Sequence, residues 1–182
     1  KKYVYSDAEL DQAIKEVGSN PFVDESIRRG FRQIATDIKV GIPIEKAFNL
    51  YFINDAKKIL RSYKDLKVIG ITGSYGKTTT KFILTRILSE KFNVVCTPHS
   101  FNTPMGVVRT VREHFKPQTQ IFVCEMGAKN VGDIKEICKI VHPDFGLITS
   151  VGEQHLETFK SVDNVFKTKF ELADAVSQKQ GL

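Results

Sequence analysis

The sequence lacks several features that would assign it to particular classes of protein. No apolar run approaches the roughly 18 residues that a membrane-spanning helix needs, and no signal peptide opens the chain. There is no internal repeat and no low-complexity tract. The 182 residues carry a net charge of +6, but the basic residues are spread along the chain. The even spread of basic residues argues against nucleic-acid binding through a basic stripe. A mildly basic surface that receives a polyphosphate substrate also explains the net charge.

Cysteine is scarce as well. Cys96, Cys124 and Cys138 are odd in number and have no spacing typical of a metal site. Two of them end apolar, strand-like runs, so we expect reduced thiols inside a cytoplasmic protein. The chain begins without methionine and ends in Gly181-Leu182. We therefore also expect it to be part of a longer protein.

One stretch that is present has the layout of a phosphate-binding loop. A short apolar run ends at Thr72, a glycine-containing turn follows, and a helical pattern begins at Lys77. Glycines let backbone N–H groups face phosphate oxygens, and the positive end of the next helix favours an anion. Lys77 would place a charge on the outer phosphates, and Thr78 would offer a hydroxyl to magnesium. The usual pattern G-x-x-x-x-G-K-[ST] has a glycine where this chain has Ile71, so the loop alone leaves nucleotide binding open.

Two patterns divide the chain. Residues 1–66 predict three helices, with a capping box that starts at Ser6 and a break at Gly41-Ile42-Pro43. From Lys67 onward, short apolar strands alternate with helices, which predicts an α/β domain over residues 67–182 with a parallel sheet and helices on its faces. The expected strands are 68–72, 93–97, 121–125 and 145–149, and the expected helices are 77–91, 104–115, 131–140 and 162–177. In the first of these helices we expect the side chains that face inward to be Phe82, Ile83, Ile87 and Leu88.

Residues suited to chemistry follow each predicted strand. In a parallel sheet the carboxyl ends of the strands share one edge, where ligands collect. Glu125 ends the third strand and suits magnesium beside Thr78, whereas His155, after the fourth, would be a less usual magnesium ligand. Each residue alone also has a structural explanation: Asn102 as a turn residue, His155 as a structural histidine and Lys169 as a solvated helix lysine. Their position along one edge favours the functional interpretation.

Taken together, these motifs resemble the central ATP-binding domain of the Mur ligases, the amide ligases that build peptidoglycan. The similarity covers residues 67–176 and lies in Gly73-Ser74-Tyr75-Gly76-Lys77-Thr78-Thr79, Asn102 with Gly106, Glu125-Met126-Gly127, His155-Leu156-Glu157 and Lys169-Phe170-Glu171. These ligases commonly lack the first glycine of the loop, so Ile71 is consistent with the family. The third and fourth segments look most like the members that add D-alanyl-D-alanine to a UDP-N-acetylmuramoyl tripeptide.

The resemblance implies an ATP-dependent reaction. ATP would phosphorylate the carboxylate of a UDP-linked muramoyl peptide, and the amine of D-Ala-D-Ala would attack the acyl phosphate. The residues that the resemblance assigns to ATP are Gly73, Ser74, Tyr75, Gly76, Lys77, Thr78 and Thr79. The implied metal ligands are Thr78 and Glu125 on one magnesium ion, His155 on a second, and Lys169, which many of these enzymes carry as a carbamate. The implied catalytic residues are Lys77, Asn102, His155 and Lys169.

Some features depart from the family pattern. Tyr75, Thr103 and Ser150 stand where asparagine is common, and residues 1–66 do not resemble the usual UDP-substrate-binding domain. Two other functions stay open. The first is a ligase similar to folylpolyglutamate synthase, against which Glu125-Met126-Gly127 argues, and the second is a nucleotide-binding module without catalysis. We expect a monomer without nucleic-acid partners, and little or no ligase activity if these residues were the whole protein.

Overall fold

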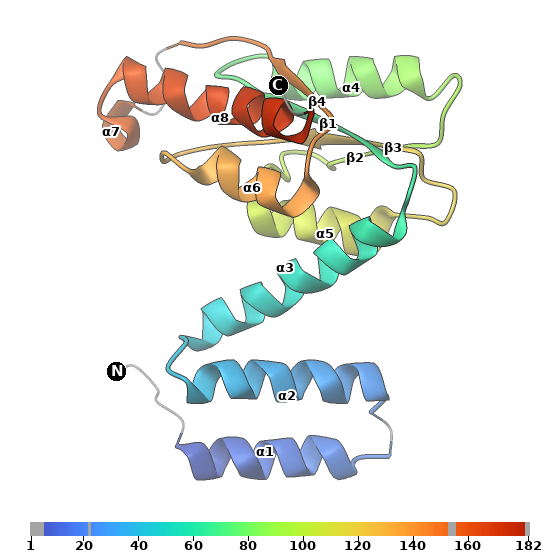
Figure 1. Ribbon diagram of the computed structural model, residues 1–182, viewed down its shortest axis with the longest axis vertical. Coiled ribbons are helices and arrows are strands. Elements are labelled where there is room, and N and C mark those ends of the chain that lie inside the picture. Colours follow the sequence, from blue (N-terminus) through green and yellow to red (C-terminus); the bar gives the residue numbers. More distant parts are fainter. Residues whose placement is uncertain (1–5, 22, 153–155, 181–182) are drawn as a thin grey trace. The chain divides into compact units, whose positions relative to one another are not determined.

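The computed structural model describes residues 6–21, 23–152 and 156–180 (Figure 1). The chain forms two compact units, Lys1–Asp55 and Ala56–Leu182, and the boundary between them falls within helix α3 (Ile44–Ser62). Among the described residues, no helix combines the length and apolar character needed to cross a membrane.

The first unit is helical, as the sequence predicted. It contains α1 (Asp7–Ser19), α2 (Glu25–Lys39) and the first part of α3. The predicted capping box is present: the Glu9 N–H donates to Ser6 Oγ at 3.3 Å, and the Ser6 N–H donates to Glu9 Oε2 at 2.7 Å. The Asp24 carboxylate caps α2 by accepting from the Ile27 N–H at 2.9 Å. Local sequence therefore determines where these two helices begin.

The second unit is an α/β domain. Its elements are β1 (Lys67–Thr72), α4 (Lys77–Leu88), β2 (Val94–Cys96), α5 (Pro104–His114), β3 (Ile121–Glu125), α6 (Asp133–Val141), β4 (Phe145–Ile148), α7 (Leu156–Phe159) and α8 (Val162–Gln180). The strands pair in the order β2-β3-β1-β4, and every pairing is parallel. The predicted parallel sheet with alternating helices is confirmed, and the four-residue helix α7 was not predicted.

Helices cover both faces of this sheet (Figure 1). Helix α4 contacts β1, β2 and β3 on one face, while α6 and α8 pack against each other and against β1 on the other. The connection after β1 leads toward β2, and the connection after β3 leads the opposite way, toward β4. A crevice for ligands is therefore expected between the carboxyl ends of β1 and β3, where the chain direction switches.

Alternation along the strands decides which side chains reach α4. Ile71 and Val123 belong to a core cluster that includes Leu84 and Leu88 of α4. Because successive strand residues point to opposite faces, Glu125, two residues after Val123, lies on the α4 face as well. The sheet therefore directs a carboxylate toward the helix that follows the phosphate-binding loop.

Glycines let α8 approach the opposite face closely. A Cβ atom at Gly70 would lie 2.7 Å from Leu172 Cδ1, and one at Gly146 would lie 3.0 Å from Leu172 Cγ. Lys169 precedes Leu172 by three residues and so lies on the same face of α8. Close packing of this helix consequently buries Lys169, which is 2% exposed.

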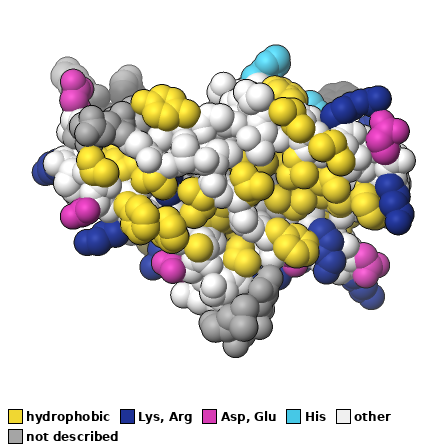
Figure 2. Space-filling model, turned by 90° about the horizontal axis from the view of Figure 1, so that it is seen from above, with side chains coloured by type: hydrophobic (Ala, Val, Ile, Leu, Met, Phe, Trp, Pro, Cys, Tyr) yellow, Lys and Arg dark blue, Asp and Glu magenta, His cyan; other side chains and the backbone are white. Residues whose placement is uncertain are grey.

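The predicted inward face of α4 is largely wrong. Phe82, Ile83 and Ile87 are 49%, 56% and 62% exposed. Leu88 packs against the core as predicted, together with Leu84, which was not predicted. Both sets of residues have helical spacing, so periodicity alone does not choose between them. Further exposed apolar side chains lie on β4 and α8, and Figure 2 shows hydrophobic side chains gathered over the face seen from above.

The three cysteines are free thiols, as expected. Cys124 and Cys138 are buried, and Cys96 is half-buried. Burial raises the pKa of the Cys138 thiol to about 12. A buried thiol that stays protonated is a poor nucleophile and a poor metal ligand, so the thiol of Cys138 contributes packing rather than chemistry.

Candidate functional site

The loop between β1 and α4 is held by the residues that follow β4. The Ser74 N–H donates to the Ser150 carbonyl at 2.8 Å, and the Tyr75 N–H donates to Ser150 Oγ at 2.9 Å. Gly73 has a φ of +147°, and a side chain there would collide with the Thr149 hydroxyl. Tyr75 and Ser150, which both depart from the family pattern, thus contact each other and help to fix the loop.

Helix α4 presents its first turn to the site. Its N-cap, Gly76, is left-handed with a φ of +82°, and no side chain caps the helix. The first amides of α4 are therefore suited to receive an anion. Lys77 Nζ donates to the carbonyls of Gly73 at 2.7 Å and Ser74 at 3.1 Å, which places its ammonium group over the loop. Burial lowers the pKa of Lys77, and the nearby Glu125 carboxylate opposes this effect.

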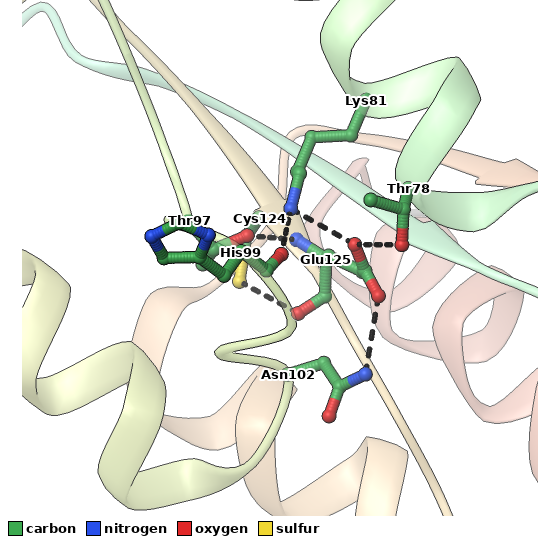
Figure 3. Close-up of polar contacts among 7 residues, drawn as sticks. All are labelled: Thr78, Lys81, Thr97, His99, Asn102, Cys124 and Glu125. Atoms are coloured by element: carbon green, nitrogen blue, oxygen red, sulfur yellow. Dashed lines mark hydrogen bonds and ion pairs between the residues drawn. The ribbon is translucent and has the colours of Figure 1, made fainter.

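Glu125 is the centre of the polar cluster in Figure 3 and is 1% exposed. Its Oε2 accepts from Thr78 Oγ1 at 3.0 Å, and its Oε1 accepts from Asn102 Nδ2 at 3.1 Å. Its backbone N–H donates to Thr97 Oγ1 at 3.0 Å. The fold therefore brings Thr78, Asn102 and Glu125 together from three separate segments. Their roles toward a ligand stay predictions.

Lys81 belongs to this cluster, although the sequence reasoning missed it. Its Nζ lies 3.0 Å from Glu125 Oε2, and its side chain is 0% exposed. It follows Lys77 by one helical turn, so the two lysines lie on the same face of α4. Lysine is almost never fully buried without a partner. The available signal was a lysine one helical turn after Lys77, together with the carboxylate of Glu125 expected at the end of the third predicted strand.

A cavity of about 470 Å³ opens beside the cluster, lined by residues that include Lys77, Thr78, Asn102, Glu125 and Lys169. Burial lowers the pKa of Lys169 to about 8, the charge of Lys77 contributes in the same direction, and Asp133 and Glu171 oppose it. Lys169 is thus a buried amine at the wall of the cavity rather than a solvated helix lysine.

Glu171, two residues after Lys169, has a structural role. Its carboxylate accepts from the Gly132 N–H at 2.7 Å and from the Lys135 N–H at 2.8 Å. Gly132 is the N-cap of α6 and supplies no side-chain cap of its own. Glu171 therefore caps α6 from a different helix and ties α6 to α8, which supports the position of Lys169.

Other predicted site residues contribute less to this geometry. His155, proposed as a ligand of a second magnesium ion, lies outside the described residues. The Tyr75 side chain is 59% exposed, and Thr79 is exposed on α4. The binding roles of Tyr75 and Thr79 therefore rest on the sequence pattern alone.

The donor atoms present suit magnesium. Within residues 6–21, 23–152 and 156–180, no group of three or more His, Cys, Asp or Glu gathers around one point. Among the oxygen donors that line the cavity, the Glu125 carboxylate and the Thr78 hydroxyl lie 3.0 Å apart. Mg²⁺ is usually bound through one or two carboxylates, with water and substrate phosphates completing its shell. The site thus fits Mg²⁺ that arrives with a polyphosphate.

Comparison with known proteins gives concordant matches. A family model described as the Mur ligase middle domain matches residues 71–181. The UDP-N-acetylmuramoyl-tripeptide–D-alanyl-D-alanine ligase of Bacillus subtilis is 29% identical over 164 residues, which cover 86% of this chain and 35% of that protein. MurF from Acinetobacter baumannii matches with a TM-score of 0.68 at 32% identity, over 71% of this chain and 28% of that one. MurF ligase from Thermotoga maritima in complex with ADP matches with a TM-score of 0.66 at 36% identity, over 70% and 30%. The chain spans about a third of the length of these relatives.

Proposed function

The chain belongs to the Mur ligase family, and we propose from this that it forms the ATP-binding part of a cytoplasmic ligase that adds D-alanyl-D-alanine to a UDP-N-acetylmuramoyl tripeptide. The main structural support is the convergence of Lys77, Thr78 and Glu125 on one cavity at the carboxyl ends of the strands. The names of the matched relatives support the choice of substrates.

In the proposed reaction, a carboxylate oxygen of the tripeptide attacks the γ-phosphorus of ATP, and ADP leaves. The amine of D-alanyl-D-alanine then attacks the acyl carbon, and phosphate leaves. Lys77 and the first amides of α4 would hold the β- and γ-phosphates and neutralise their charge. Thr78 and Glu125 would hold Mg²⁺, which supplies further charge neutralisation at the phosphate oxygens. Asn102 would lie near the γ-phosphate.

Lys169 is proposed to act as a carbamate. A pKa of about 8 leaves part of its amine neutral near neutral pH, and a neutral amine can add CO₂. The addition forms an N–C bond, releases the amine proton and replaces a cation by a carboxylate. The two lysines on the cavity wall, Lys77 and Lys169, would then attract rather than repel each other. The new carboxylate would lie where it can assist the Mg²⁺ ligands.

We expect ligase activity to depend on dissolved CO₂, and more strongly as the pH falls. The neutral fraction of Lys169 decreases below its pKa of about 8, so at a fixed CO₂ concentration less carbamate forms at pH 6.5 than at pH 8.5. Activity would be measured in CO₂-depleted buffer with bicarbonate added back, and the carbamate carbon would be observed by ¹³C NMR. Lys169→Arg should remove the dependence and the signal together. Lys167→Arg, at an exposed position of the same helix, should change neither.

The proposed function predicts phosphate release that needs both substrates. In the complete gene product that contains this chain, we expect turnover of about 1 per second or more when the UDP-linked tripeptide and D-alanyl-D-alanine are both present. Either substrate alone should support little release. Release with folate and glutamate instead would identify the related ligase reaction. No release with either pair would favour a nucleotide-binding module without catalysis.

A further inference from the structure

Lys81 is a fully buried lysine that the proposed reaction leaves without a role. Its Nζ lies 3.0 Å from Glu125 Oε2 and donates to the His99 carbonyl at 2.5 Å. The two oxygen partners belong to different segments, since Glu125 ends β3 and His99 lies between β2 and α5 (Figure 3). A single ammonium group therefore connects α4 to both segments. A buried ammonium group requires such partners, because its desolvation is otherwise unfavourable.

The His99 end of this connection holds an unfavourable backbone conformation. His99 has a φ of +41°, in the left-handed region that residues other than glycine rarely adopt. Such a conformation persists where the surrounding structure holds it. The His99 residue is exposed, its ring lies edge-on to that of Phe101, and its carbonyl is held by the bond from Lys81.

The same segment, residues 98–103 between β2 and α5, carries Asn102. The Gly127 N–H donates to the Asn102 carbonyl at 2.7 Å, and the Asn102 amide donates to Glu125. A Cβ atom at Gly127 would lie 2.7 Å from the Asn102 side chain, so the two residues are in close contact. Asn102 is thus fixed on the side of β3 by these contacts. Lys81 fixes the preceding part of the segment to α4.

We propose that Lys81 is a positioning residue that holds the segment 98–103 against α4 and so sets the preference of the site for a nucleotide with a γ-phosphate. The γ-phosphate part rests on the proposed function, which places Asn102 near that group. Lys81 itself would contact neither phosphate nor magnesium. Without Lys81 the phosphate loop and Lys77 would still receive the inner phosphates. The segment 98–103 would then keep its contacts to the β3 side but lose the bond to α4, so Asn102 would be less well ordered.

A second lysine with partners of the same kind supplies a control, although its side chain is 41% exposed. Lys179 Nζ lies 2.9 Å from Asp144 Oδ1 and donates to the His142 carbonyl at 2.7 Å. His142 is also left-handed, with a φ of +49°. The chemistry of the contact is therefore the same: lysine, carboxylate and the carbonyl of a left-handed histidine. Asp144 directly precedes β4, whereas the candidate site lies where the strands end.

The test compares Lys81→Met with Lys179→Met. Binding of ADP and of the non-hydrolysable analogue with a β,γ-imido bridge would be measured by calorimetry with Mg²⁺ present, and amide hydrogen exchange would be measured over residues 98–103. In Lys81→Met we expect about tenfold weaker binding of the analogue, ADP binding within about threefold of wild type, and faster exchange in the segment. Lys179→Met should show none of these changes. Lys81→Arg, which retains several N–H donors, should recover part of the preference for the analogue.

Equal weakening of ADP and the analogue, or unchanged exchange over residues 98–103, would overturn the proposal. If the wild-type protein bound neither nucleotide, the proposed function would fail first, and hydrogen exchange would still decide whether Lys81 orders the segment. Should Lys81→Met not fold because Glu125 is left without its cation, Glu125→Gln and the double variant Lys81→Met/Glu125→Gln replace it. Glu125→Gln keeps the bond to His99, so exchange in the segment should be faster in the double variant. Equal exchange in these two variants would contradict the role given to Lys81.

Discussion

Replacing Lys77 by alanine should weaken ATP binding and reduce turnover by about two to three orders of magnitude, because it removes a charge aimed at the transferred phosphate. The fold should persist, since alanine suits the first turn of α4 and Lys77 is only half-buried. ATP affinity would be measured by calorimetry and the free energy of unfolding by urea titration. We expect the unfolding free energy to change by no more than about 1 kcal/mol.

The control for this experiment is Lys67→Ala. Lys67 is an exposed lysine at the start of β1, at the opposite end of the strand that leads into the phosphate loop. Its removal lowers the net charge by the same amount and should leave ATP affinity unchanged within a factor of about two, because surface charges far from a site are screened by salt. If Lys77→Ala binds ATP as tightly as the wild type, the loop is not the nucleotide site, and the proposed function fails at its first step.

Replacing Glu125 by alanine should affect both stability and activity. The change leaves Lys81, which is 0% exposed, as a buried cation without its carboxylate partner. Removing one member of a buried ion pair lowers the free energy of unfolding by about 3–5 kcal/mol. Thr78 and Asn102 would also lose the acceptor that each now uses. Urea unfolding would measure the stability, and phosphate release in the complete gene product would measure the activity, which we expect to be lost.

Glu113→Ala is a suitable comparison because Glu113 pairs with Arg109 on the surface of α5, with the two side chains 49% and 60% exposed. Exposed pairs four residues apart on a helix contribute only about 0.3–0.5 kcal/mol. The double variant Lys81→Met/Glu125→Ala should be more stable than Glu125→Ala, since it removes the unpaired charge. An unfolding free energy for Glu125→Ala as high as that of Glu113→Ala would mean that the buried pair does not form.

Several parts of this site could be predicted from local sequence. The phosphate loop, the strand before it and the helix after it are contiguous in the chain, so Gly73, Lys77 and Thr78 could be identified together. Glu125 could be added because the carboxyl ends of parallel strands share an edge. The register confirms this geometry, since Glu125 pairs with Ile71, one residue before the end of β1. Neighbours across a parallel sheet can be inferred once the strands are recognised.

The role of α4 shows where this reasoning stops. Of the four residues predicted to face inward, Leu88 does so, whereas Phe82, Ile83 and Ile87 are exposed. The unpredicted Lys81 and Leu84 face the sheet beside Leu88. The rotation of a helix about its axis depends on what it packs against, and here Glu125 attracts Thr78 and Lys81 from the same side. Hydrophobic periodicity takes no account of this attraction between polar side chains. The wrongly predicted face of α4 and the missed Lys81 therefore have one cause.

The sequence by itself determined the phosphate loop and the alternation of strands and helices, because each depends on residues close together in the chain. It also indicated the family, because several motifs occur in the same order along the chain. Only the tertiary structure decided how those elements face one another. Gly70 and Gly146 let α8 approach the sheet, and this packing makes Lys169 a buried amine. Rotation of α4 makes Lys81 the partner of Glu125. Burial and pairing depend on side chains from distant segments, and these meet only when the chain is folded.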